Sequence, residues 1–301
     1  MRVSIIAPIL ATIQLCSAGW PCCLKGTDDN RDGEGYTLLT HTDGCDVTYG
    51  TCVDENASIC PSEGGEAQAP IDLEVLDISR PDPQIFHSFD YYYDDVEARL
   101  IVPQRRLCIA KIMNGSEPVW MSSFRKTTEY IKVYLRNGAP ELVNTVVSVI
   151  PTLHNTYFEL NDGKWTHSLE THLDKFKTLK VIPASFHSFS LNISVIKDTE
   201  HCTSFEVVIL GTSTRYFFPK YSHYAVRVQD GEKALWTSDG HSKCISCTIF
   251  TYPSGKQQLV IELVGIKGSD FRYFDRAGRR WKKVTRKAFI KNKKKEMGNS
   301  K

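Results

Sequence analysis

The chain has 301 residues, of which 41% are hydrophobic and 11% aromatic, and this content excludes global disorder. With 37 basic and 35 acidic residues and a net charge of +2, it is not a uniformly basic nucleic-acid-binding protein. The charges are nevertheless segregated: residues 19–98 hold 18 acidic and 3 basic side chains, whereas residues 276–301 hold 12 basic and 1 acidic. We therefore expect any partner that recognises charge to bind near one end of the chain.

The first eighteen residues have the layout of a signal peptide. Met1 and Arg2 form a short positive start, residues 3–15 are mostly apolar, and the small residues of 16–18 predict cleavage after Ala18. No later run approaches 18 apolar residues, so no membrane span is expected. The sequence therefore predicts a secreted protein.

Residues 19–70 form an acidic, cysteine-rich segment. Five cysteines fall between Cys22 and Cys60, and in an oxidising compartment such a segment is most simply held by disulfides. The segment has ten acids, two bases and few large apolar residues, so we expect it to be largely irregular. Without Cys16 the chain keeps nine cysteines; the pairing stays open, and the odd number leaves one thiol that could link two chains.

The four tryptophans after residue 20 indicate a tandem duplication. Trp120 and Trp165 are 45 residues apart, Trp236 and Trp281 are also 45 apart, and the offset between the pairs is 116. Other identities follow the same offset, including Gly115 with Gly231 and Tyr157-Phe158 with Tyr273-Phe274. A repeat of about 115 residues is too long for a solenoid, so each copy is predicted to be a domain with its own core. The four tryptophans are expected to belong to these repeat cores and to pack a helix onto each sheet.

Alternating apolar and polar residues predict strands through most of each copy, in the order 71–75, 131–136, 189–195 and 224–229, and the apolar run 259–264 predicts a central strand. Helical spacing follows the second tryptophan of each copy, with Ser168 and Thr285 as N-cap candidates. The predicted fold class is α+β, with two tandem β-rich domains at 71–183 and 184–296, each a mostly antiparallel sheet with one C-terminal helix, and a tail at 297–301.

The ordered motifs of the two copies resemble the FAINT domain, a module frequently associated in Theileria and found in secreted proteins of piroplasm parasites. The first copy carries them at 76–79, 115–120 and 157–165, and the second at 191–194, 231–236 and 273–281. The resemblance covers about residues 71–296, and the acidic, tyrosine-rich insert at 90–95 departs from it. It implies export and contact with the host, and it carries over no catalytic residue.

No constellation of residues in the sequence favours catalysis, a metal or a cofactor. The acidic stretch 28–33 matches half of a calcium-binding loop, but Leu39 stands where a bidentate glutamate is needed. Cys244 and Cys247 form a single CxxC in a strand pattern, where positions i and i+3 point to opposite faces, so separate disulfides, one of them to Cys202, are favoured over zinc. The histidines show no metal-ligand spacing. We therefore expect no enzyme, no cofactor and no metal site.

A run of cations near the C-terminus is the strongest surface signal, and it comprises Lys282, Lys283, Arg286, Lys287, Lys291, Lys293, Lys294 and Lys295. Three interpretations stay open: a solvated helix end, a surface for an anionic partner, or a nuclear-localisation address. We expect this basic tail to be an electrostatic docking element that is not part of the fold.

These features together predict a secreted, non-enzymatic binding module at the boundary between parasite and host. Its partner would be a host or parasite protein or an anionic surface, and nucleic acid is not expected. The alternatives are a structural or antigenic surface protein without a specific ligand, and an enzyme of unrecognised type. The expected location is outside the producing cell, either in the host cell or on the parasite surface.

Overall fold

The structure is a computed structural model that describes residues 73–105, 107–121, 127–149, 152–266 and 268–298. The predicted signal peptide and the cysteine-rich segment lie outside these residues. All described residues belong to one compact unit. Strands make up 63% of them and helices 10%, so the described chain is mostly β.

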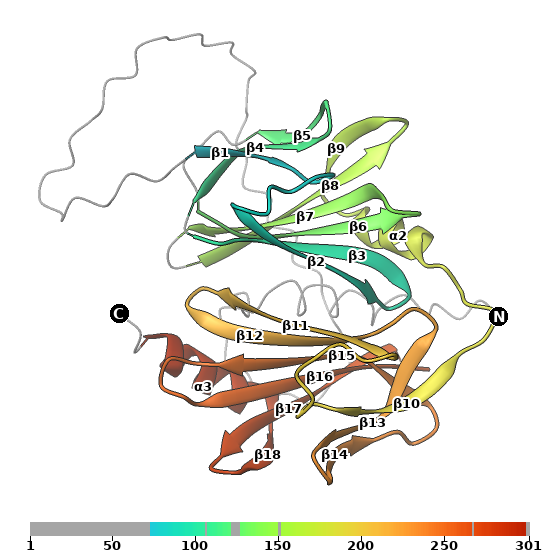
Figure 1. The fold of residues 1–301 in the computed structure, drawn as a ribbon, viewed down its shortest axis with the longest axis vertical. Helices are drawn as coiled ribbons and strands as arrows, with labels where there is room; N and C mark the ends of the chain where they lie inside the picture. The colour runs from blue at the N-terminus through green and yellow to red at the C-terminus, as the bar shows by residue number, and fades with distance from the viewer. Residues whose placement is uncertain (1–72, 106, 122–126, 150–151, 267, 299–301) are drawn as a thin grey trace, which may run out of the picture. The chain divides into compact units, whose positions relative to one another are not determined.

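In the first half of the described chain, a three-stranded sheet faces a six-stranded one (Figure 1). The small sheet has the order β1-β4-β5, with β1 parallel to β4. The large sheet is antiparallel, in the order β2-β3-β6-β7-β8-β9. The strands are β1 (Leu73–Asp77), β2 (Phe86–Tyr93), β3 (Val96–Pro103), β4 (Cys108–Asn114), β5 (Glu117–Met121), β6 (Thr127–Arg136), β7 (Ala139–Val149), β8 (Thr152–Asn161) and β9 (Lys164–Ser168).

In the second half the corresponding strands form one nine-stranded sheet. Its main path is β10-β13-β15-β16-β17-β18, with β11 paired to β12, β12 to β15 and β14 to β13. The single pair Ala225 with Cys244 joins β13 to β15, a connection that the first half does not show among its described strands. The strands are β10 (His187–Asn192), β11 (Cys202–Ile209), β12 (Thr212–Pro219), β13 (His223–Asp230), β14 (Lys233–Thr237), β15 (Ser242–Thr251), β16 (Gln257–Gly265), β17 (Gly268–Ala277) and β18 (Arg280–Val284).

Each half begins with the same polar contact at the end of its parallel strand pair. In the first half, the backbone N–H of Gly115 donates to the Asp77 carboxylate over 3.0 Å. In the second, the N–H of Gly231 donates to the Asn192 side-chain oxygen over 3.1 Å. Both glycines have a positive φ, a conformation that a residue with a Cβ adopts only with strain. The short Asp-Ile-Ser and Asn-Ile-Ser phrases therefore fix the strand ends to the turns that follow β4 and β13.

The predicted fold class is wrong, because one hydrophobic cluster is built from both halves. The aromatic face of β2 packs on the β11–β12 hairpin: the rings of Phe89 and Phe205 stack with centroids 4.4 Å apart, and those of Tyr91 and Phe218 with centroids 4.1 Å apart. The buried hydroxyl of Tyr93 also donates to the Glu262 carboxylate over 2.7 Å. The described chain is a mostly β unit and not two tandem α+β domains.

The same contacts correct the interpretation of residues 90–95 as an acidic insert. These residues end β2 and turn into β3, and the tyrosines at 91 and 93 are buried while Asp94 and Asp95 occupy the turn with positive φ. The two turn carboxylates form ion pairs with lysines: Asp94 pairs with Lys180, and Asp95 lies 3.4 Å from the Lys243 amine.

The two described helices lie on the faces of the sheets away from the tryptophans. Helix α2 (His172–Leu179) buries Leu173, Phe176 and Leu179 in the cluster that both halves share. Trp120 and Trp165 pack instead on the cluster between the two sheets of the first half, and Trp236 and Trp281 on the matching cluster of the second. The prediction that the tryptophans pack the helices onto the sheets is therefore wrong. Neither described helix is long and apolar enough to cross a membrane.

Candidate functional site

Helix α3 (Arg286–Gly298) carries most of the predicted cationic residues and is fixed to the nine-stranded sheet. Thr285 caps it, since its hydroxyl accepts a hydrogen bond from the N–H of Ala288 over 3.3 Å. The buried ring of Phe289 contacts Tyr273 with centroids 5.0 Å apart. One turn on, the Asn292 amide donates to the Asp275 carboxylate over 2.5 Å.

The far end of the helix is held as well. Glu296 is buried and accepts hydrogen bonds from the Ser254 hydroxyl over 2.6 Å and from the Lys256 amine over 3.2 Å. These bonds hold the pKa of Glu296 below its usual value, with the Ser254 bond as the larger favourable cause. The prediction that the basic tail is not part of the fold is therefore wrong for residues 286–298.

Seven of the eight predicted cations remain exposed on the outer side of this helix and on β18, and we call them the basic surface. They are Lys282, Lys283, Arg286, Lys287, Lys291, Lys294 and Lys295. None of them forms an ion pair with another residue that the structure describes. Lys287, Lys291 and Lys294 follow one another at i, i+4 and i+7, so they form a single row along the helix.

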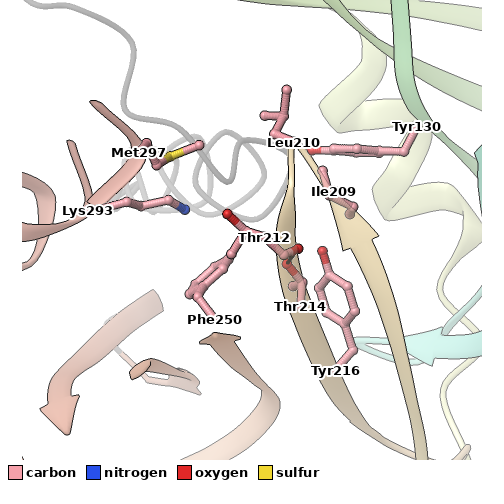
Figure 2. A pocket seen from close by; sticks show the side chains of 9 residues that line it. All are labelled: Tyr130, Ile209, Leu210, Thr212, Thr214, Tyr216, Phe250, Lys293 and Met297. Carbon is pink, nitrogen blue, oxygen red and sulfur yellow. Dashed lines mark hydrogen bonds between the residues drawn. The ribbon is translucent and has the colours of Figure 1, made fainter. Parts of the chain in front are cut away.

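The eighth cation, Lys293, is on the opposite side of the helix. Its side chain is only 7% exposed and lines a pocket between α3, β15 and the β11–β12 hairpin (Figure 2). The helical period separates it from the row of exposed lysines, because residue 293 shares its face with Phe289 and Glu296. It therefore does not belong to the basic surface.

The CxxC is arranged differently from the prediction. Cys244 and Cys247 are both buried in the second-half core with sulfurs 3.6 Å apart, because the register of β15 shifts between Cys244 and Ser246 and turns both side chains to one face. Cys202 is buried in the same cluster, and all three carry free thiols. Among the residues described, no group of three potential ligands is placed to hold a metal. The structure therefore contradicts the prediction of separate disulfides at these three cysteines, including the one to Cys202.

The structure also gathers three histidines that the sequence pattern did not connect. The ring centroid of His223 on β13 lies 5.4 Å from that of His187 on β10 and 5.0 Å from that of His201. The parallel pairing of β10 with β13 places His187 directly opposite His223, a register that no sequence spacing reveals. The rings pack against one another as tilted aromatic pairs, and among the described residues they are not placed to coordinate a metal ion.

Comparison with known proteins gives two distant relatives. The chain is 25% identical over 233 residues to the 104 kDa microneme/rhoptry antigen of Theileria annulata, a match that covers 75% of this chain and 25% of that protein. It is 24% identical over 203 residues to the 104 kDa microneme/rhoptry antigen of Theileria parva, covering 64% of this chain and 20% of that protein. The chain thus spans a quarter or less of the length of the relatives that it matches.

No protein-family signature matches the chain, and no solved structure matches it. The resemblance to the FAINT domain therefore remains a resemblance. What the comparisons support is distant similarity to antigens of piroplasm apical organelles, which is compatible with a secreted or apical protein at the interface of parasite and host.

Proposed function

We propose that this chain is a secreted, non-enzymatic binding protein of the parasite–host boundary whose basic surface contacts an anionic partner. One observation carries the proposal: seven exposed cations without ion-pair partners among the described residues lie on a helix and strand that the sheet holds in place. Preformed charge of one sign attracts an opposite surface without a cost of ordering the helix. The similarity to microneme/rhoptry antigens supports the proposed location.

The test compares two triple variants of the full chain that remove the same charge. In the first, Lys287, Lys291 and Lys294 of the helix row become Gln. In the second, three exposed lysines elsewhere, at 164, 197 and 233, become Gln. Retention on immobilised heparin, a polyanion, is measured as the salt concentration that elutes each protein.

We expect the helix variant to elute at clearly lower salt, while the matched control elutes close to the unaltered chain. Both should keep the unaltered melting temperature, because none of the six side chains has an ion-pair partner in the described structure. Equal losses in the two variants would mean that only net charge matters. That result would favour the alternative, a structural or antigenic surface protein without a specific ligand.

A further inference from the structure

The lysine row on helix α3 is the part of the helix that lies furthest from the sheet. The side chains that hold the helix on the nine-stranded sheet and its turns include Phe289, Asn292 and Glu296. At 3.6 residues per turn, the row lies on the opposite side of the helix from these three. It extends from residue 287 to residue 294, a straight line of about 10 Å at the rise of an α-helix. The row is therefore an exposed ridge of positive charge.

No carboxylate competes for this ridge on the two elements that carry the basic surface. Glu296 is the single acid between Arg280 and Gly298, and it faces the sheet, where it is bonded to Ser254 and Lys256. On an exposed helix, an acidic residue three or four positions from a lysine would offset part of its charge. The ridge has no such residue, so its charge is available to an external anion.

The ridge also has no apolar or aromatic neighbours at the surface. The two aromatic side chains of β18 and α3, Trp281 and Phe289, are buried, and the exposed large apolar side chains of the described residues all lie outside these two elements. An amphipathic helix binds a bilayer through its apolar face, and on α3 that face already packs on the sheet. Protein partners are usually anchored by aromatic or apolar side chains, and single-stranded nucleic acids stack on aromatic rings. The surface therefore favours none of these three partners.

Lysine makes up six of the seven cations of the basic surface. The planar guanidinium of arginine binds a phosphate, or the edge of a guanine base, through two parallel hydrogen bonds, whereas the amine of lysine is a compact, strongly hydrated point charge. A surface with a single arginine is therefore poorly suited to duplex nucleic acid. A row of lysines responds to the density of negative charge along the partner more than to the shape of one anionic group.

We infer that the basic surface binds a sulfated polysaccharide, and this inference rests on the function proposed above. Such a polymer is polar and hydrated and carries strong-acid groups at short intervals along one chain, so it needs neither an apolar anchor nor a stacking ring. A linear polyanion can lie along the ridge with successive sulfates beside successive lysines. Arg286 and Lys295 flank the row on its two sides and extend the contact.

The test compares four anionic probes on the full chain at physiological salt. Heparin is the sulfated probe, and hyaluronan, a uronic-acid polysaccharide without sulfate, is its matched control. The other two probes are duplex DNA and vesicles of phosphatidylserine and phosphatidylcholine in equal amounts. We expect the Kd for heparin to be about tenfold lower than that for hyaluronan or the vesicles, because sulfation raises the charge along the chain. It should also be lower than the Kd for duplex DNA.

Three variants connect the binding to the row. Two are the triple glutamine variants described above, one in the row and one at 164, 197 and 233. The slope of log affinity against log salt counts the ion contacts, and each lysine lost from a contact with a linear polyanion lowers it by somewhat less than one. For heparin, the row variant should lower the slope by about 2–3 and the control should leave it unchanged. The third variant combines Lys287→Arg, Lys291→Arg and Lys294→Arg, and it should keep heparin binding because it keeps the charge.

Failure of this inference and failure of the proposed function give different results. Equal losses of heparin binding in the row variant and the control would overturn both. Heparin binding that depends on the row, together with equally tight binding of hyaluronan, DNA or the vesicles, would overturn only the inference. Loss of heparin binding in the arginine variant at an unchanged melting temperature would also overturn it, because the row would then not act through charge density.

Discussion

Phe205 provides a test of whether the two halves form one cooperative unit. Its ring is 9% exposed, stacks on Phe89 with an interplanar angle of 8°, and also contacts Tyr91 and Phe218. Replacing a core phenylalanine by alanine costs about 3–5 kcal/mol. Since Phe89 is only partly buried, we expect Phe205→Ala to lower the free energy of unfolding by about 3 kcal/mol. About 0.5–1.5 kcal/mol of that should reappear as coupling in a double-mutant cycle with Phe89→Ala.

The assay is urea unfolding of the full chain, followed by amide exchange resolved to individual strands. If the halves share one core, Phe205→Ala should speed exchange in β7 of the first half as much as in β16 of the second. Val208→Ala is the matched control on the same strand, since Val208 is 62% exposed and its loss should change stability by less than about 0.5 kcal/mol. The reasoning would be refuted if exchange in β7 stayed unchanged, because the halves would then unfold as separate domains.

Three further predictions concern the thiols, an ion pair and the polar turns. Burial raises the pKa of Cys202 to about 12, so iodoacetamide at pH 8 should leave this thiol unmodified in the folded chain and alkylate it in urea, as peptide mass spectrometry would detect. The pKa of Glu206 is lowered, first by a hydrogen bond from Ser213, so its stabilisation is present above the unfolded-state pKa and is lost as the pH falls through the lower folded-state pKa. Glu206→Gln should therefore flatten the decline of stability below about pH 5 in urea titrations, and an unchanged slope would contradict this assignment. Asp77→Ala and Asn192→Ala each remove an acceptor of backbone N–H groups and should each cost about 1–2 kcal/mol; a large difference between the two would show that the two turns do not contribute alike.

Sequence periodicity identified many of the strands and both helices, because burial of one face leaves a regular pattern. The alternation at 131–136 lies within β6, that at 224–229 lies within β13, and the helical spacings correspond to α2 and α3. The duplication stays a prediction, and the repeated order of strand pairings supports it. Periodicity shows which face of a strand is buried, but it does not show which other element packs on that face. In the sequence, the aromatic residues of β2 and β11 are compatible with any buried sheet face. Nothing in their spacing indicates that these two strands, from different halves, pack on each other.

The candidate site was predicted only in outline, because helix α3 is docked mainly by polar contacts. The helix is so rich in basic residues that its sequence pattern predicts a solvent-exposed helix. The residues that hold it lie elsewhere in the chain, Asp275 on β17 and Ser254 in the turn between β15 and β16. Sequence therefore located the cations but could not separate the buried Lys293 from its exposed neighbours. In the same way, the shift in β15 that turns Cys244 and Cys247 to one face has no signature in a four-residue motif.

The core shared by the two halves has a consequence for synthesis. The tyrosine-bearing face of β2 can be covered only after the β11–β12 hairpin exists, and that hairpin ends at Pro219, 40 residues beyond the end of α2 at Leu179. At about 5–20 residues per second, a nascent first half would present this aromatic face uncovered for roughly 2–8 seconds. During that interval the uncovered aromatic face could bind chaperones or associate prematurely with a neighbouring chain.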